Sequence, residues 1–334
     1  MVKQRKDIYI SLMNRIACVM LINQGLLLVL SRVLEYINLV LVNNFGQNDF
    51  VNIFALSCEC VNYFLAFIVP VILFNKMNKY SQKEVYEPKD NDKKTPLYAV
   101  LLLGIGLAVI LCSSFVNHYL INLFTDYSDF SSKMFWSVEL NKPYQIVFYI
   151  VSYAIIPAFV EEILFRGMVC KSLQIYGKGT AIVISATLFS LMHTNIEQLL
   201  FTFIAGLFFG LLYVETKSVK MPILLHFINN FISVIREILY QNATPKVYEI
   251  FSSLADLLIL TVGLICCIGL FYYIKKNKIT FKKGIEMKPD ENGNEVLSLS
   301  INERISGFFS RGMIIFVVYS LAIMSYFVYL SVML

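Results

Sequence analysis

The chain has 334 residues, of which 57% are hydrophobic and only 15% are charged. An ordinary soluble domain carries about 25% charged residues, so this composition excludes a typical soluble protein. Apolar stretches of roughly twenty residues recur along the whole chain and predict an all-α polytopic membrane protein. The net charge of +5 requires no nucleic-acid partner, because the basic residues gather in a few segments between the apolar stretches.

Nine apolar stretches are candidates for membrane-spanning helices. The first begins at Ile16 and has no small-residue cleavage site after it, so we expect a retained helix and not a signal peptide. In the sixth stretch, the sequence GLFFG at 206–210 has the small-residue spacing that is typical of closely packed helices. The nine predicted spans are residues 16–37, 53–74, 97–116, 144–170, 179–193, 196–214, 220–240, 251–274 and 312–333.

Lysine and arginine residues are distributed unevenly over the segments that connect these spans. If the N-terminus lies in the cytosol, the long cytosolic loops are 75–96 and 275–311, and both are rich in lysine. Positive charge concentrates on the cytosolic side of membrane proteins, so we predict a cytosolic N-terminus and an external C-terminus. The segments predicted to lie outside contain only Lys133, Lys142 and Lys246.

Three charged residues interrupt the fourth apolar stretch, in the sequence AFVEEILFRG at 158–167. Glu161, Glu162 and Arg166 are costly inside a membrane, and ionisable residues in such places are functional candidates by default. Glu162 and Arg166 are four residues apart and share one helix face, which also allows an internal ion pair without any chemistry.

Two histidines are predicted at the depth of these glutamates. Glu161 precedes the turn at Gly177 by 16 residues, and His193 follows that turn by 16 residues. At a rise of 1.5 Å per residue, antiparallel helices would place both side chains about 24 Å from the turn. His226 and Asn230 share one face of the seventh stretch, which starts from the same side. We therefore expect carboxylates, imidazoles and an amide to meet.

Such a set of side chains fits hydrolysis of an acyl bond by an activated water. A buried carboxylate beside a histidine can hold and deprotonate a water molecule. A second histidine with a nearby amide can donate hydrogen bonds to a developing oxyanion. Cys170 and Ser190 are the nearest alternative nucleophiles, but the spacing gives neither of them a base. A zinc site formed by one glutamate and two histidines is also open, because the spacing does not separate the two ways of activating water.

Three motifs on these helices resemble the CPBP family of CAAX-protease and bacteriocin-processing membrane peptidases, also called Rce1-like or Abi proteins. EEILFR contains Glu161, Glu162 and Arg166 and matches the EExxxR motif. FSLMH contains Phe189 and His193 and matches FxxxH, and HFINN contains His226 and Asn230 and matches HxxxN. The ordered triple is specific although each motif alone is weak, and the resemblance covers residues 144–235.

The resemblance implies roles for these residues. Glu161 and His193 would activate water, and His226 and Asn230 would stabilise the oxyanion. Glu162, Arg166 and Phe189 would support them. The implied enzyme is a glutamate-type endopeptidase that needs no cofactor. The alternative is a zinc enzyme with Glu161, His193 and His226 as ligands.

The resemblance also implies a helical bundle in the plasma membrane, with a cavity that opens to the cytosol. The lysine-, asparagine- and isoleucine-rich composition favours a bacterial source. The expected partners are the lipid bilayer and a membrane-associated peptide or protein substrate, in peptide or bacteriocin maturation, CAAX-type processing or self-immunity. We expect three units: helices one to three in 1–143, the catalytic core in 144–240, and helices eight and nine in 241–334.

Two other functions remain open at this stage. A non-enzymatic bacteriocin-immunity or scaffold protein could keep the same fold, although a pure binding protein has less need of four intact polar residues. A transporter with a glutamate–histidine proton relay is disfavoured, because the sequence lacks paired broken helices in two matching halves.

Overall fold

The computed structural model describes residues 2–77, 95–124, 140–277 and 299–333. Nine of the helices it describes are α1 (Val2–Phe45), α2 (Asp49–Met77), α3 (Pro96–Phe124), α8 (Lys178–Met192), α9 (Ile196–Thr216), α10 (Lys220–Asn242), α11 (Pro245–Lys276), α12 (Ile301–Phe308) and α13 (Arg311–Met333). Between α3 and α8 lies one long helical segment. It consists of α5 (Pro143–Ile150), a π-helical part (Val151–Ile155), α6 (Ile156–Glu162), a second π-helical part (Ile163–Cys170), α7 (Lys171–Leu173) and a 3₁₀ turn (Gln174–Tyr176).

The predicted all-α polytopic fold is confirmed, because each of the nine predicted spans is helical. Within the described residues, seven helices are long and apolar enough to cross a membrane, and α12 with α13 forms an eighth if this pair, bent by 59°, counts as one span. The remaining predicted span is α8, which has only 15 residues. Such a helix is about 22 Å long, shorter than the hydrocarbon core of a bilayer. The number of nine crossings therefore stays a prediction.

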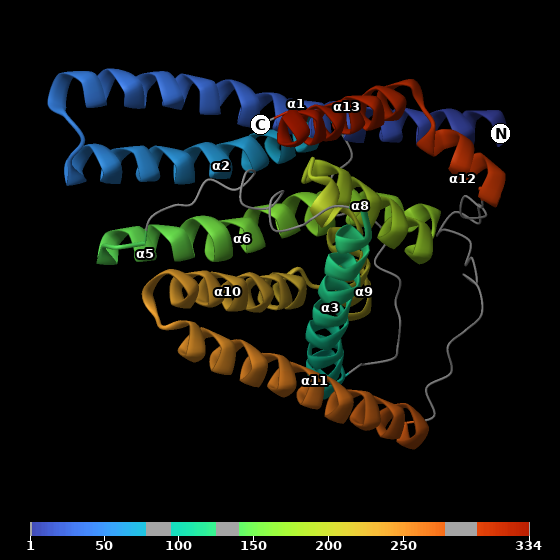
Figure 1. Ribbon diagram of the computed structural model, residues 1–334. Helices are drawn as coiled ribbons and strands as arrows, with labels where there is room; N and C mark the ends of the chain where they lie inside the picture. The colour runs from blue at the N-terminus through green and yellow to red at the C-terminus, as the bar shows by residue number, and fades with distance from the viewer. Residues whose placement is uncertain (1, 78–94, 125–139, 278–298, 334) are drawn as a thin grey trace.

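Figure 1 shows how the long helices are stacked. Helices α1, α2 and α13 run along one another, α5 and α6 continue the stack below α2, and α10 and α11 follow. Helix α3 runs across this stack and packs against both α9 and α11, while α8 pairs with α9. The chain from α5 to α10 is thereby enclosed between the N-terminal helices and α11.

Helices α1 and α2 are joined at a proline inside α2. Pro70 has no N–H, so the carbonyl of Ala66, four residues earlier, loses its ordinary helical partner. Asn23 of α1 donates a hydrogen bond of 2.8 Å to that carbonyl, and both side chains are buried. A second link follows next to it, because Asn62 donates to the hydroxyl of Ser31 at 3.2 Å. A neighbouring side chain thus satisfies the backbone group that proline frees in the membrane.

Helices α8 and α9 approach closely where the sequence predicted it. A Cβ atom on Gly206 would lie 3.0 Å from the backbone of Ala186, and one on Gly210 would lie 3.2 Å from the side chain of Ile182. Larger residues would push the two helices apart. The small-residue spacing at 206–210 therefore serves helix packing, as expected.

The two ends of the bundle collect the segments that were predicted to share a side. At one end, the ring of Tyr9 lies 4.6 Å from that of Tyr176, and its hydroxyl donates to the carbonyl of Arg304 at 3.4 Å. At the other end, Lys142 forms an ion pair with Asp49. Most of loops 75–96 and 275–311 lies outside the described residues. Which end faces the cytosol stays a prediction.

Candidate active site

The helix that carries both glutamates changes its winding on each side of them. The N–H of Ile156 donates to the carbonyl of Val151, and that of Lys171 donates to the carbonyl of Arg166. Both bonds reach back five residues, which is the π-helical pattern and is frequent at functional sites. Glu161 and Glu162 end the short α-helical stretch between these two parts, so their side chains leave the helix in different directions.

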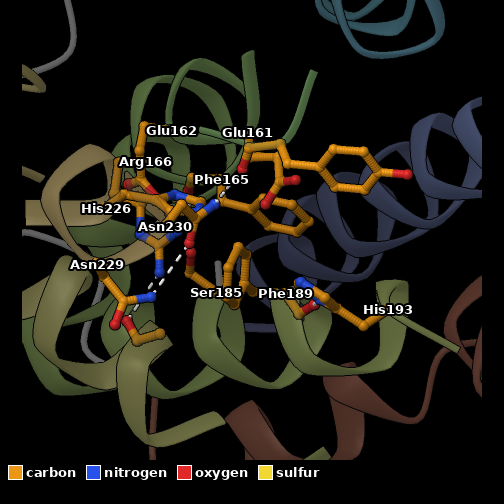
Figure 2. Close-up of polar contacts among 12 residues, drawn as sticks. Glu161, Glu162, Phe165, Arg166, Ser185, Phe189, His193, His226, Asn229 and Asn230 are labelled. Carbon is orange, nitrogen blue, oxygen red and sulfur yellow. Dashed lines mark hydrogen bonds and ion pairs between the residues drawn. The ribbon is translucent and has the colours of Figure 1, made fainter. Parts of the chain in front are cut away.

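Glu162 forms a buried ion network with the neighbouring helices. Its Oε1 accepts a hydrogen bond from Nη1 of Arg166 at 2.9 Å and one from Nδ1 of His226 at 3.0 Å. The other terminal nitrogen of Arg166 donates to the carbonyl of Gly206 at 2.9 Å. Glu162 and Arg166 are 0% exposed. The same-face ion pair that the sequence allowed is therefore present, and it also holds His226 (Figure 2).

The rings of Phe165, Phe189 and Phe209 surround the guanidinium group of Arg166. The guanidinium carbon of Arg166 lies 4.8 Å from the ring centre of Phe189 and 5.0 Å from that of Phe209. The ring of His226 stacks on Phe209, with centres 4.9 Å apart and planes at 16°. A cation over an aromatic face is attracted to it, most strongly where water is excluded. Phe189 thus lies against the arginine, in the supporting position that the family motif implied for it.

Glu161 is directed away from the ion network and meets a residue of α2. Its Oε1 accepts a short hydrogen bond from the hydroxyl of Tyr63. Its Oε2 is buried and has no hydrogen-bond partner among the described residues. Figure 2 shows Glu162 beside Arg166 and His226, with Glu161 apart from them. Adjacent in sequence, the two glutamates thus have separate surroundings.

His193 ends α8 and is fixed by its own helix. Its Nδ1 lies 2.8 Å from the carbonyl of Phe189, and its ring meets the Phe189 ring edge to face at 4.8 Å. A carbonyl can only accept, so Nδ1 carries the proton and Nε2 of the neutral ring is an acceptor. The next residue, Thr194, has φ of 47°, a conformation that costs a β-branched residue on the order of 1–3 kcal/mol. The turn after His193 is therefore strained.

Asn230 provides a hydrogen bond that is missing in the helical segment 143–176, called the glutamate helix below. Pro157 has no N–H to give to the carbonyl of Tyr153, four residues before it. Nδ2 of Asn230 donates to that carbonyl at 3.1 Å, and Oδ1 of Asn230 accepts from Asn229 at 3.1 Å. This is the arrangement that Asn23 makes with Ala66, repeated between α10 and the glutamate helix.

A cavity of about 580 Å³ joins these groups. Its size lies in the range of small-molecule and peptide sites. Of the seven residues that the sequence singled out, the cavity is lined by Glu161, Phe189, His193, His226 and Asn230, whereas Glu162 and Arg166 do not line it. The spacing argument allowed either glutamate to be the base, and of the two only Glu161 lines the cavity.

Other lining residues did not emerge from the sequence. Tyr63 comes from α2, and Tyr149, Tyr153, Asn229 and Glu237 come from α5, its π-helical extension and α10. The only signal for Tyr63 was its hydroxyl beside Asn62 in an apolar stretch, which is weak because tyrosine is common in membrane helices. Its partner Glu161 lies on another helix, α6, so no spacing within α2 indicates the contact.

The cavity extends towards one end of the bundle. Starting from Glu161 and His226, its lining continues along α5 to Tyr149 and along α10 to Glu237. These helices meet at that end, where the N–H of Leu140 donates to Oε1 of Gln241 at 3.1 Å. In the predicted topology this is the outer end. The expected opening to the cytosol therefore does not follow from the lining residues and stays a prediction.

The residues proposed as zinc ligands were Glu161, His193 and His226. In the described part of the chain, no three His, Cys, Asp or Glu side chains come together as metal ligands. In this arrangement the three residues do not fit a metal site.

The two alternative nucleophiles lie away from the cavity. Cys170 is 0% exposed and is not among the lining residues. The hydroxyl of Ser190 donates to the carbonyl of Leu199, so it is engaged in joining α8 to α9. Within the described part of the chain, neither residue is bonded to a base that would activate it.

Comparisons with known proteins bear on the same region. Residues 143–232 match the family model "Type II CAAX prenyl endopeptidase Rce1-like", and all seven candidate residues lie within the match. The chain is also 27% identical over 193 residues to the membrane-embedded CAAX protease MroQ of Staphylococcus aureus, which covers 56% of this chain and 76% of the relative. No solved structure matches. Over residues 143–232 the chain is therefore similar to the Rce1-like membrane peptidases, and the three motifs of this region gather around one cavity.

Proposed function

We propose that this protein is an endopeptidase that hydrolyses a peptide bond in a membrane-associated protein or peptide, with a water activated by Glu161 and His193. The observation that carries the proposal is the free Oε2 of Glu161, which belongs to a carboxylate that lines the cavity. Buried polar atoms without partners are rare in proteins, and each calls for an explanation, such as a bound water or ligand.

The two groups are complementary to one water molecule. Oε2 of a Glu161 carboxylate and Nε2 of neutral His193 are both acceptors, and water has two hydrogens to donate. A water bound to both would have its oxygen lone pair free for attack. Glu161 then takes one proton as the oxygen bonds to the carbonyl carbon of the substrate. When the carbon–nitrogen bond breaks, the leaving amine receives that proton from Glu161, and the carboxylate is restored.

The tetrahedral intermediate needs donors for its oxyanion. Nδ1 of His226 gives its hydrogen to Glu162, so Nε2 can donate only when the ring is an imidazolium. Asn230 uses its amide for the Tyr153 carbonyl and keeps a second N–H for the substrate. These two residues therefore support the proposed oxyanion site.

The lining residues favour a particular kind of substrate. Two carboxylates, Glu161 and Glu237, and no lysine or arginine belong to the described cavity wall. An acidic side chain next to the cleaved bond would be repelled, whereas a neutral or basic one would be accepted. Similarity to MroQ, a membrane-embedded CAAX protease, supports CAAX-type processing, and maturation of a small peptide is the other role that we propose.

The deciding experiment compares cells that produce the wild-type protein with cells that produce Glu161→Gln or His193→Ala. Membrane peptides and new protein termini are identified by mass spectrometry. We expect a set of termini that is present with the wild type and absent with both variants, at equal levels of the protein in the membrane. Full biological activity of both variants would refute the proposal and favour the non-enzymatic immunity or scaffold protein.

A further inference from the structure

Tyr63 joins the catalytic carboxylate to a helix outside the family match. It lies on α2, whereas residues 143–232 match the family model. Its hydroxyl donates to Oε1 of Glu161, and both residues line the cavity. No motif of the family refers to this position, so its role has to be argued from its contacts.

The hydrogen bond makes the two oxygens of Glu161 unequal. Oε1 is occupied by Tyr63, and Oε2 is buried without a partner among the described residues. Oε2 of Glu162 is also buried without one, but Glu162 does not line the cavity. Among the described residues, Oε2 of Glu161 is therefore the only glutamate oxygen that is buried, has no partner and belongs to a residue lining the cavity. Without Tyr63, the carboxylate could rotate and present either oxygen.

Tyr63 is itself held in place by rigid surroundings. The preceding residue, Asn62, is bonded to Ser31 of α1, and one turn later Asn23 of α1 is bonded to the carbonyl that Pro70 frees. The ring of Phe67 packs on that of Tyr63, with centres 4.8 Å apart. A donor fixed to this degree can position a carboxylate, because catalytic groups need supporting residues whose own positions are locked.

We propose that Tyr63 is a positioning residue that holds Oε1 of Glu161, so that Oε2 is the oxygen that accepts the proton of the attacking water. This inference rests on the proposed function of Glu161. It means that the catalytic unit includes α2 and is not confined to residues 144–240.

The test uses Tyr63→Phe in the full-length protein, reconstituted into vesicles. The matched control is Tyr98→Phe, because Tyr98 also donates to a glutamate, Oε2 of Glu215 at 3.0 Å, and does not line the cavity. With a peptide identified by the mass-spectrometric comparison, we expect kcat to fall about 10- to 100-fold in Tyr63→Phe with little change in KM. Tyr98→Phe should behave as the wild type in both constants.

A second measurement is independent of peptidase activity. Infrared difference spectra recorded across a pH titration show the C=O band of protonated carboxyl groups, and its loss in Glu161→Gln identifies the band of Glu161. In Tyr63→Phe the frequency of this band should differ from that in the wild type and in Tyr98→Phe, because the carboxyl group of Glu161 loses a hydrogen-bond donor. An unchanged band would overturn the positioning role. Activity that persists in Glu161→Gln would instead remove the proposed function, so the two failures are distinguishable.

Discussion

The side chain of Asn230 donates its amide hydrogen to the carbonyl of Tyr153, the backbone group that Pro157 leaves without a helical partner. The bond joins α10 to the π-helical part Val151–Ile155 of the glutamate helix. This part directly precedes α6, which carries Glu161. It shows that the asparagine of the third motif has a structural partner on the helix of the first motif. Proline, asparagine and glutamate thus act as one unit in the site.

Replacing Pro157 should therefore separate stability from activity. Pro157→Ala restores an N–H that can bond to the Tyr153 carbonyl, so the helix is stabilised while Asn230 loses its partner. We expect a higher midpoint of thermal unfolding in detergent together with about a tenfold fall in kcat. Pro70→Ala is the control, because it makes the same change in α2 next to Asn23. It should raise stability and leave kcat as it is. Equal kcat values in both variants would contradict the role of Asn230.

The two adjacent glutamates should respond differently to the same substitution. Glu162→Gln leaves Arg166 with an unpaired buried charge, and breaking a buried pair in this way costs about 3–5 kcal/mol. Glu161→Gln removes no ion pair and should unfold close to the wild-type temperature while losing turnover. Thermal unfolding monitored in detergent checks both. If Glu161→Gln were the less stable variant, the assignment of the two glutamates to base and support would be reversed.

Arg166→Lys provides a further check on this network. Lysine keeps the charge, but it cannot donate to Glu162 and to the carbonyl of Gly206 at once in the planar geometry of arginine. The unfolding temperature of Arg166→Lys in detergent should therefore lie between that of the wild type and that of Glu162→Gln.

Chelation tests whether a metal takes part. The arrangement of the histidines leaves a water between two acceptors, so we expect that dialysis against a strong chelator does not change the rate of the purified protein. Elemental analysis should find no zinc in proportion to the enzyme. Loss of turnover on chelation that is restored by stoichiometric zinc would show that Glu161, His193 and His226 rearrange to bind the ion.

The sequence predicted the helices well, and it failed where tertiary contacts decide. Counting from Gly177 related Glu161 to His193, and both line the cavity, because antiparallel helices of equal length preserve depth. Depth does not determine direction, so spacing could not tell Glu161 from Glu162. The π-helical parts and the packing of α2 separate them. Tyr63 could not be found because its distance from Glu161 in the chain carries no periodic signal.

The face from which the cavity is reached can be measured with a single cysteine. Ser233 is an exposed lining residue on the part of α10 that leads towards Glu237. In a variant whose seven native cysteines are replaced, Ser233→Cys can be treated with a membrane-impermeant thiol reagent, in intact cells and in inside-out vesicles. Ser172→Cys, close to the Gly177 turn at the other end of the bundle, serves as the control.

If the topology from lysine distribution holds, Ser233→Cys should react in intact cells and Ser172→Cys only in inside-out vesicles, because the lining runs towards the end that bears Lys142. Reaction of Ser233→Cys only in inside-out vesicles would instead place the opening on the cytosolic side, as the family resemblance implied. Since the bundle has its two ends fixed by contacts, a reversed result at both positions would mean that the whole chain is inverted relative to the prediction. The labelling pattern therefore decides the side of the cavity and the orientation of the chain in one experiment.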